Sequence, residues 1–205
     1  MNALSNGPAD LPFSPACERN KAPIGEVLQK NLPENAHVLE IGAGTGQHAV
    51  YFSQLMPGVN WQSTDVAENV PSLRARFELE APDRLPPPLA LDVRDENWPP
   101  GPYDAVFTAN TLHIMPYDLA PLLVRGAAAV LVPGGRLICY GPFHDNGVHT
   151  APSNESFDRS LRARDARMGI RDAVEFQRLA RSCGLALEAD LALPANNRML
   201  LFTRL

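Results

Sequence analysis

Short apolar runs alternate with amphipathic segments along most of this chain, and this alternation predicts its fold. Runs at about 36–41, 59–65, 89–92, 103–109 and 136–140 have the length and composition of buried strands. Strands that alternate with helices are typical of a mainly parallel sheet covered on both faces. Between the runs, apolar positions recur every three or four residues, which predicts helices at 47–56, 70–77 and 119–132.

The two ends of the chain add further elements to this pattern. The spacing of Ile24 and Leu28 predicts a short helix ahead of the first strand, and Asp118 is in position to cap helix 119–132. Residues 185–191 and 198–204 have the pattern of two strands that lie close in sequence, which predicts antiparallel neighbours.

Two segments lie outside the repeating strand–helix units. Asp172 and Glu175 form a capping-box-like start for a last helix, which Gly184 ends. Residues 142–171 separate the fifth strand from this helix, and the apolar spacing within them indicates that part of the segment is helical. A connection of this length is usually a lid or a binding loop. Residues 1–13 carry glycine, proline and polar residues and predict a mobile tail, which leaves 14–205 as a single domain.

A glycine-rich turn follows the first strand directly. Gly42, Gly44 and Gly46 alternate with other residues, and Glu40 precedes the first glycine by two positions. A strand, glycine loop and helix in succession place a ligand against the N–H groups of the helix N-terminus. A dinucleotide site favours G-x-G-x-x-G, whereas this pattern resembles motif I of the class I S-adenosylmethionine (SAM) methyltransferases. A glycine turn without a ligand and a dinucleotide site with a displaced glycine are the alternatives.

Acidic residues also end the second and third predicted strands. Asp65 is in position to accept hydrogen bonds from two ribose hydroxyls, and such bonds to a charged group contribute about 1.5–3 kcal/mol each. For Asp92 and Val93, the methyltransferase resemblance implies that the acid receives the adenine amino group and that the next N–H meets a ring nitrogen. Each aspartate is also compatible with an ordinary turn or helix cap. Together with Glu40, they suit a cationic sulfonium ligand.

Polar residues after the fourth and fifth strands are candidates for the chemistry. Asn110 and His113 follow the fourth strand at a position that resembles motif IV, where groups face the reactive methyl. The ordinary pKa of histidine makes His113 a candidate general base, although it is also compatible with a histidine that only packs against the cofactor. Tyr140 ends the fifth strand and either lines a substrate cavity or packs as a core aromatic.

A second motif supports the same fold. Pro133-Gly134-Gly135 resembles the methyltransferase turn that precedes the fifth strand. The resemblance implies a Rossmann-like α/β class I methyltransferase fold, with a seven-stranded, mostly parallel sheet in the order 3-2-1-4-5-7-6 and helices on both faces.

Composition and charge limit which kinds of partner and which cellular compartment we expect. The net charge is -5 and no long basic run occurs, which argues against nucleic acid as a partner. No two of the three cysteines have the C-x-x-C spacing of a zinc site, and no cluster of His, Asp or Glu requires a metal. No apolar stretch has the length of a membrane span or of a secretory signal. We therefore expect a cytoplasmic protein, as a monomer or a homodimer.

Four segments carry a closer resemblance: Ser14–Lys21, Glu40–His48, Ser153–Asp158 and Gly169–Asp172. They look like the methyltransferase-like 26 family over nearly the whole chain. The resemblance implies that an arm with Glu18, Arg19 and Asn20 and an insertion with Asn154 and Arg171 belong to one design.

We expect the arm and the insertion to close over the cofactor, with Arg19, Asn20, Asn154 and Arg171 at the substrate. Either arginine is suited to an anionic substrate group or to the methionine carboxylate. Pairing of Arg19 and Arg171 with surface acids is the alternative.

These patterns predict a SAM-dependent methyltransferase that acts on a small-molecule nucleophile. The sulfonium activates the methyl group, so the protein mainly positions the reactants, which lowers a barrier by roughly 7–11 kcal/mol. A SAM-fold enzyme that transfers another group and a SAM-binding sensor without turnover are the alternatives, because a fold does not fix a function.

Overall fold

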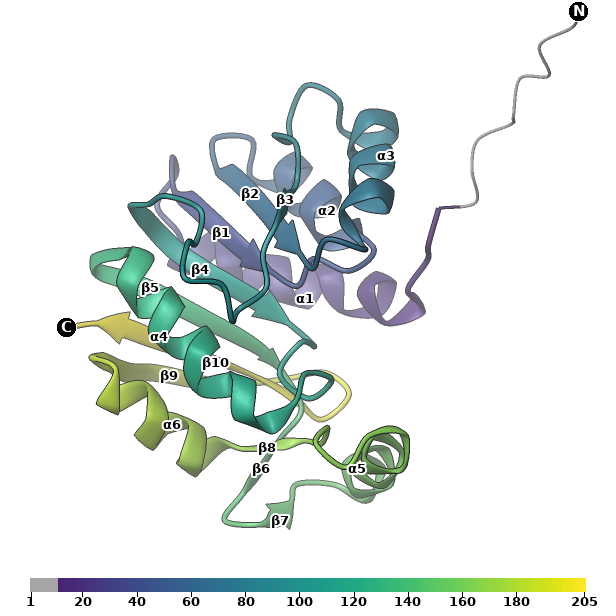
Figure 1. The fold of residues 1–205 in the computed structure, drawn as a ribbon, viewed down its shortest axis with the longest axis vertical. Helices are drawn as coiled ribbons and strands as arrows, with labels where there is room; N and C mark the ends of the chain where they lie inside the picture. The colour runs from purple at the N-terminus through teal and green to yellow at the C-terminus, as the bar shows by residue number, and fades with distance from the viewer. Residues whose placement is uncertain (1–10) are drawn as a thin grey trace, which may run out of the picture.

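The computed structural model describes residues 11–205, and a seven-stranded sheet lies at its centre (Figure 1). The strand order is β3-β2-β1-β4-β5-β10-β9, which confirms the predicted order, since β9 and β10 are the sixth and seventh strands of this sheet along the chain. β10 pairs antiparallel with both β5 and β9, and the other pairs in this sheet are parallel. The strands are β1 (His37–Ile41), β2 (Asn60–Asp65), β3 (Leu89–Ala90), β4 (Tyr103–Ala109), β5 (Leu131–Gly141), β9 (Leu185–Leu193) and β10 (Asn197–Arg204).

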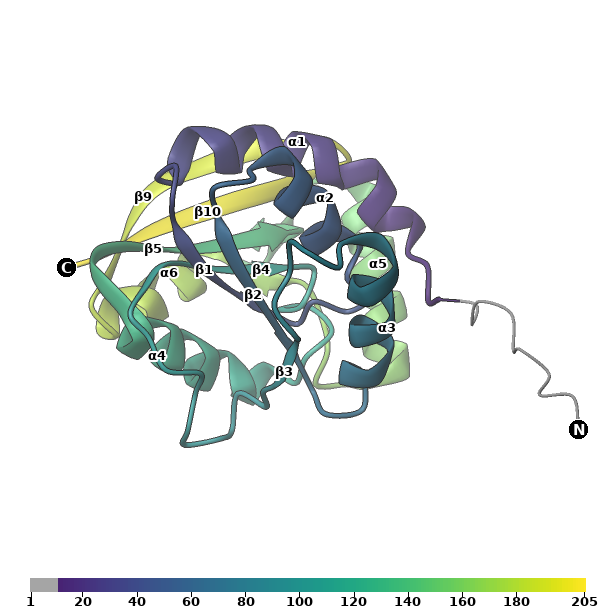
Figure 2. The same cartoon turned by 90° about the horizontal axis from the view of Figure 1, so that it is seen from above.

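Helices cover both faces of the sheet, as predicted (Figures 1 and 2). Successive residues of β4 point to opposite faces, so Phe107 packs with the first group of helices and Val106 with the second. The first group comprises α1 (Pro15–Asn31), α2 (Gln47–Leu55) and α3 (Val70–Glu80), and the second comprises α4 (Ala120–Val130) and α6 (Ala173–Ser182).

Two predicted helix boundaries were wrong. Helix α1 is 17 residues long and continues through Pro23, with Ser14 as its N-cap, whereas the sequence predicted a short helix around Ile24. Asp118 does not cap α4, because it lies within a short 3₁₀ turn, η1 (Tyr117–Leu119), that leads directly into the helix. Leu119 holds the cap position there and makes no side-chain cap bond.

The segment 142–171 holds one helix and three short strands. Helix α5 (Pro152–Arg164) lies beyond the carboxyl ends of the central strands (Figure 1). The strands β6 (Phe143–Asp145), β7 (Val148–His149) and β8 (Arg171–Asp172) form a small second sheet in the order β7-β6-β8. The structure therefore contains the helix that the sequence predicted in this segment.

Most of the predicted N-terminal tail, 1–13, lies outside the described residues. Within the described part, the Pro12 carbonyl accepts a hydrogen bond from Arg76 Nη2 at 2.7 Å. No helix within residues 11–205 combines the length and the apolar character that crossing a membrane requires.

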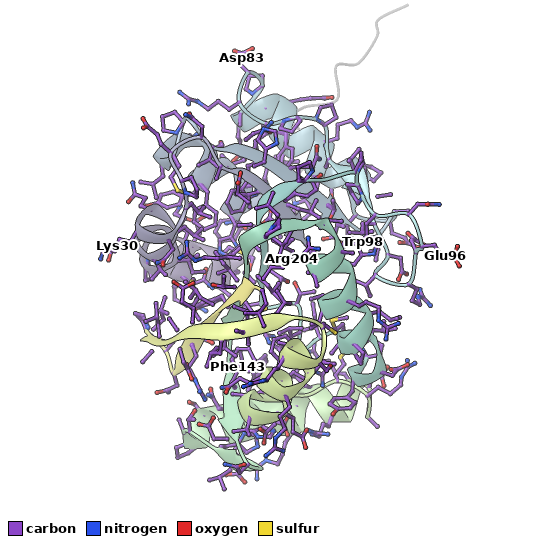
Figure 3. All side chains as sticks on the ribbon, turned by 90° about the vertical axis from the view of Figure 1, so that its left-hand side faces the viewer. Lys30, Asp83, Glu96, Trp98, Phe143 and Arg204 are labelled. Carbon is purple, nitrogen blue, oxygen red and sulfur yellow. The ribbon has the colours of Figure 1, made fainter. Side chains whose placement is uncertain are left out.

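Two aromatic side chains fasten loops to the core (Figure 3). Trp98, in the loop before β4, lies so close to Gly126 of α4 that a Cβ atom there would stand 2.1 Å from the indole ring. Phe143, the first residue of β6, is fully buried, and its ring centroid lies 6.2 Å from that of Phe176 in α6. The loop before β4 and the start of the insertion are thus both anchored on the α4 and α6 face.

One carboxyl group, that of Glu40, is buried in the centre of the sheet. It is 2% exposed, and one of its oxygens accepts hydrogen bonds from Trp61 Nε1 at 2.9 Å and from Ser63 Oγ at 2.7 Å. Burial disfavours the charged form and raises the pKa of Glu40 to about 7.

Replacing Glu40 with glutamine should change how stability depends on pH. The folded protein holds this proton up to about pH 7, whereas a glutamate with the ordinary pKa of 4.5 releases it earlier. Between these values the folded state binds more protons, so the free energy of unfolding falls as pH rises. We expect the wild type to lose about 3 kcal/mol relative to Glu40→Gln across this window in urea unfolding. A stability difference that stays constant with pH would contradict the assignment.

Candidate functional site

A cavity of about 980 Å³ opens at the carboxyl ends of β1, β4 and β5. Its walls come from the start of α1, the glycine loop after β1, the loop after β4, the start of α5 and the β9–β10 turn. The strand order reverses between β1 and β4, and ligands of open α/β sheets bind at such a point.

The three glycines of the loop differ in what surrounds them. All have positive φ, and a Cβ atom would stand 2.6 Å from Thr111 Oγ1 at Gly42 and 2.9 Å from the Leu73 side chain at Gly46. At Gly44, nothing lies within 4 Å of that position, and Gly44 lines the cavity. Packing therefore requires the first and third glycines, whereas the middle one leaves room for a ligand. Helix α2 starts directly after the loop and has no side-chain cap at its N-terminus.

Asp65 holds the glycine loop in place. One of its carboxylate oxygens accepts a hydrogen bond from Gly44 N at 2.6 Å, and the other accepts from Val66 N and Asn69 Nδ2, both at 2.8 Å. The carboxylate thus lies directly beneath the middle glycine, at the end of β2. Contact of Asp65 with a ribose stays a prediction.

The other predicted acids lie away from the cavity lining. Glu40 is hydrogen-bonded inside the sheet, so its role is in the core beneath the loop rather than the predicted contact with a ligand. Asp92 pairs with the exposed guanidinium of Arg94, whose hydrogen bonds hold the pKa of Asp92 below its ordinary value. Val93 is half-buried beside it. Contact of Asp92 and Val93 with adenine stays a prediction.

The structure brings Asn110, His113 and Tyr140 together, as predicted, and all three line the cavity. Asn110 has a φ of 60°, and its N–H donates to the Tyr140 carbonyl at 2.9 Å. Residues other than glycine in this strained region cluster at functional sites. A Cβ atom at the neighbouring Gly141 would lie 3.6 Å from His113 Nδ1 and 3.9 Å from Asn110 Oδ1.

His113 is a neutral imidazole at the cavity wall. It is 5% exposed, and its ring packs edge-to-face on Phe157 of α5 at 5.2 Å. Burial lowers the pKa of His113 to about 4, with further lowering by the positive charges of Arg171 and Arg164. Near pH 7 the ring therefore has one nitrogen lone pair available to accept a proton.

Arg171 supports the loop that carries His113 and does not line the main cavity, so its predicted contact with substrate is wrong. The side chain is 4% exposed, its Nη2 donates to the Met115 carbonyl, and its guanidinium lies 5.3 Å from the centre of the Tyr117 ring. Gly169 N donates to the His113 carbonyl at 3.0 Å. Segment 169–171, which lies outside the cavity lining, thus holds the loop after β4 through these contacts.

The α1 arm and the insertion both reach the cavity, and their closure over a cofactor stays a prediction. Asn20 is buried and its Oδ1 lies 2.7 Å from His48 Nε2, at the start of α2. Arg19 lines the cavity with an exposed side chain and forms no ion pair within residues 11–205. Asn154 Nδ2 donates to the Asn196 carbonyl at 3.0 Å, so Asn154 ties α5 to the β9–β10 turn.

The sequence analysis missed the β9–β10 turn as part of the site. Pro194, Ala195, Asn196 and Asn197 line the cavity, and Ala195 and Asn196 have φ values of 61° and 58°. A usable signal was present, because these turn-forming residues separate two strands that were already expected to pair. Since β10 runs antiparallel to β5, its first residues must lie at the carboxyl end of β5.

This fold is shared with solved structures of methyltransferases. An O-methyltransferase family protein from Burkholderia thailandensis matches 92% of this chain and 57% of its own, with a TM-score of 0.78 and 18% identity. The mitomycin 7-O-methyltransferase MmcR matches 91% and 54%, with a TM-score of 0.77 and 22% identity. Human N-acetylserotonin methyltransferase in complex with SAM matches 92% and 52%, with a TM-score of 0.78 and 15% identity. The chain thus has a Rossmann-like methyltransferase fold and spans just over half the length of these proteins.

The family is defined by a match over nearly the entire chain. The profile described as "Protein of unknown function (DUF938)" matches residues 11–204, so the chain belongs to the DUF938 family. Within residues 11–205, no three His, Cys, Asp or Glu side chains form a group that could hold a metal ion.

Replacing Gly44 with alanine should weaken binding of S-adenosylhomocysteine (SAH) roughly tenfold, by about 1.4 kcal/mol, because the new methyl group enters the space left for a ligand. Positive φ also costs stability, about 1 kcal/mol. Gly134→Ala is the matched control, since Gly134 has a φ of +77° and open space but lies outside the cavity. Titration calorimetry should show weaker binding only for Gly44→Ala. Equal affinities for the two variants would contradict the assignment of the space at Gly44 to a ligand.

Replacing Arg171 with methionine should raise the pKa of His113 towards its ordinary value of 6.5, because a buried positive charge beside the imidazole is removed. NMR titration of the His113 ring measures this shift. Arg167→Met removes an exposed charge that pairs with Asp165 and should leave the pKa unchanged. An unchanged His113 pKa in folded Arg171→Met protein would show that the two groups are not coupled.

Proposed function

We propose that this protein is a SAM-dependent methyltransferase that acts on a small-molecule nucleophile. One observation carries the proposal: a single cavity joins the open glycine cradle at Gly44 to His113 and Tyr140. A cofactor cradle and a group able to accept a proton thus face the same space. The resemblance of four segments to the methyltransferase-like 26 family agrees with this reading.

The residues at the cradle fit SAM. The space at Gly44 and the N-terminus of α2 would receive its methionine part, while Asn110 lies across the cavity at the end of β4. Asp65, at the end of β2, would contact the ribose, and Asp92 with Val93 the adenine. Among the neighbours in fold, the human N-acetylserotonin enzyme was solved with SAM bound.

When bound, SAM supplies a methyl group activated by the adjacent sulfonium. Transfer would form a bond from the acceptor atom to this methyl carbon and break the carbon–sulfur bond, whose electron pair would stay with the sulfur. A hydroxyl acceptor becomes strongly acidic during this step, and the neutral His113 imidazole takes its proton. The low pKa of His113 keeps the ring available over the whole neutral range.

The size of the cavity supports a small acceptor. Drug-sized ligands occupy pockets of about 300–1,000 Å³, and the present cavity of about 980 Å³ must hold the cofactor as well. Bonds from Asn154 to the Asn196 carbonyl and from Asn196 Nδ2 to Ser153 Oγ join α5 to the β9–β10 turn across one side. A macromolecular acceptor would have to displace this connection.

Replacing His113 with glutamine should lower kcat for methyl transfer to phenols by roughly 10²–10⁴-fold, because the proton acceptor is lost. Affinity for SAH should change little, since the glycine cradle is untouched. Mass spectrometry of reactions with SAM and catechol or 4-hydroxybenzoate measures the SAH and methyl product.

His37→Gln is the control, because His37 is exposed at the opposite end of β1 and should retain full activity. Absence of SAM binding would overturn the proposal, whereas tight binding without product from any phenol, amine or thiol would indicate a SAM-binding protein without turnover.

A further inference from the structure

The charges around the cavity indicate which acceptors it suits. Among the described residues that line it, none is Asp or Glu, and Arg19 is the one side chain with a full charge at pH 7. His48 and His113 are neutral there, because burial lowers the pKa of each to about 4. The N-terminus of α2 adds a partial positive charge. The formal charge of the described side chains that line the cavity is therefore positive.

The carboxylates of Asp65, Glu18 and Glu40 lie outside the cavity lining and accept hydrogen bonds from other groups. Asp65 is engaged by three donors on the loop side, and Glu18 is engaged by Lys21 and by Gln47 Nε2. Glu40 lies inside the sheet and holds its proton up to about pH 7. A SAM molecule itself carries a sulfonium, an ammonium and a carboxylate, and so brings a further net positive charge. A cationic acceptor would meet uncompensated repulsion, whereas an anionic one balances the charge.

The apolar side chains in the lining indicate that the acceptor has an apolar body. Phe157 and Ile114 line the cavity although they remain 38% and 48% exposed, and Pro142 is also part of the lining. Exposed apolar side chains that lie together are a feature of ligand-binding grooves. Asn154 and Asn197 add neutral hydrogen-bonding groups to the same lining.

We infer that the methyl acceptor is a small aromatic hydroxyl compound that carries a carboxylate, and that Arg19 supplies the charge that attracts it. The inference rests on the proposed function and specifies its substrate class. The carboxylate balances the positive lining, the ring packs against the Phe157 and Ile114 side chains, and the hydroxyl is the group that loses its proton to His113.

The test uses three probes of one shape and different charge: benzoate, benzamide and benzylamine. Each is titrated into the full-length protein saturated with SAM, and the ring signals of His113 and Tyr140 are followed by NMR. We expect benzoate to bind at least tenfold more tightly than benzamide, and benzylamine to cause no shift. Arg19→Met should remove most of the preference for benzoate, and Arg19→Lys should retain part of it.

Arg74→Met is the matched control, because Arg74 is exposed on α3 and outside the cavity, and the change in net charge is the same. Equal affinity for benzoate and benzamide, binding of benzylamine, or no binding of any probe would overturn the inference. Failure of SAM itself to bind would instead overturn the proposed function, so the two failures are distinguishable.

Discussion

The hydrogen bond from Gly44 N–H to the Asp65 carboxylate is the contact on which the site depends. It joins the loop after β1 to the end of β2 at 2.6 Å, and a hydrogen bond to a charged group is worth about 1.5–3 kcal/mol. The donor is the one glycine whose side-chain position is open to the cavity. The loop is therefore fixed by the protein itself, and the first turn of α2 is aimed at the cavity before any ligand arrives.

The sheet then determines what faces that loop. Parallel strands deliver their carboxyl ends to one edge, which brings Asn110 after β4 and Tyr140 at the end of β5 towards Gly44. The antiparallel strand β10 starts at the same edge, so the turn before it completes the wall. Residues from distant parts of the chain therefore meet at this edge of the sheet because of strand direction. Their side chains do not have to bond to one another to be placed there.

Strand direction also explains which features the sequence could predict. Apolar runs located the strands and the alternating glycines located the loop, because both are local patterns, whereas the strand order and the place of His113 after the fourth strand came from the resemblance to the class I methyltransferases. Arg171 was misplaced because its spacing carries no information on the packing of segment 169–171 behind the loop. The extent of α1 was missed because Pro23 is unfavourable in a helix interior, a local signal that burial of Ile24 and Leu28 against the sheet overrides.

The insertion influences the chemistry of the site as well as its shape. The buried Arg171 guanidinium is stabilised by the Met115 carbonyl and the Tyr117 ring, neither of which carries a negative charge. Its positive charge is thus left to act on His113, where it adds to the effect of burial and keeps the imidazole neutral. About half of the histidine side chains in solution would be protonated near pH 6.5, and that half cannot accept a proton. Burial, which is the larger cause, and the charges of Arg171 and Arg164 from the insertion together take this titration out of the neutral range, so the His113 imidazole stays neutral when the pH changes there.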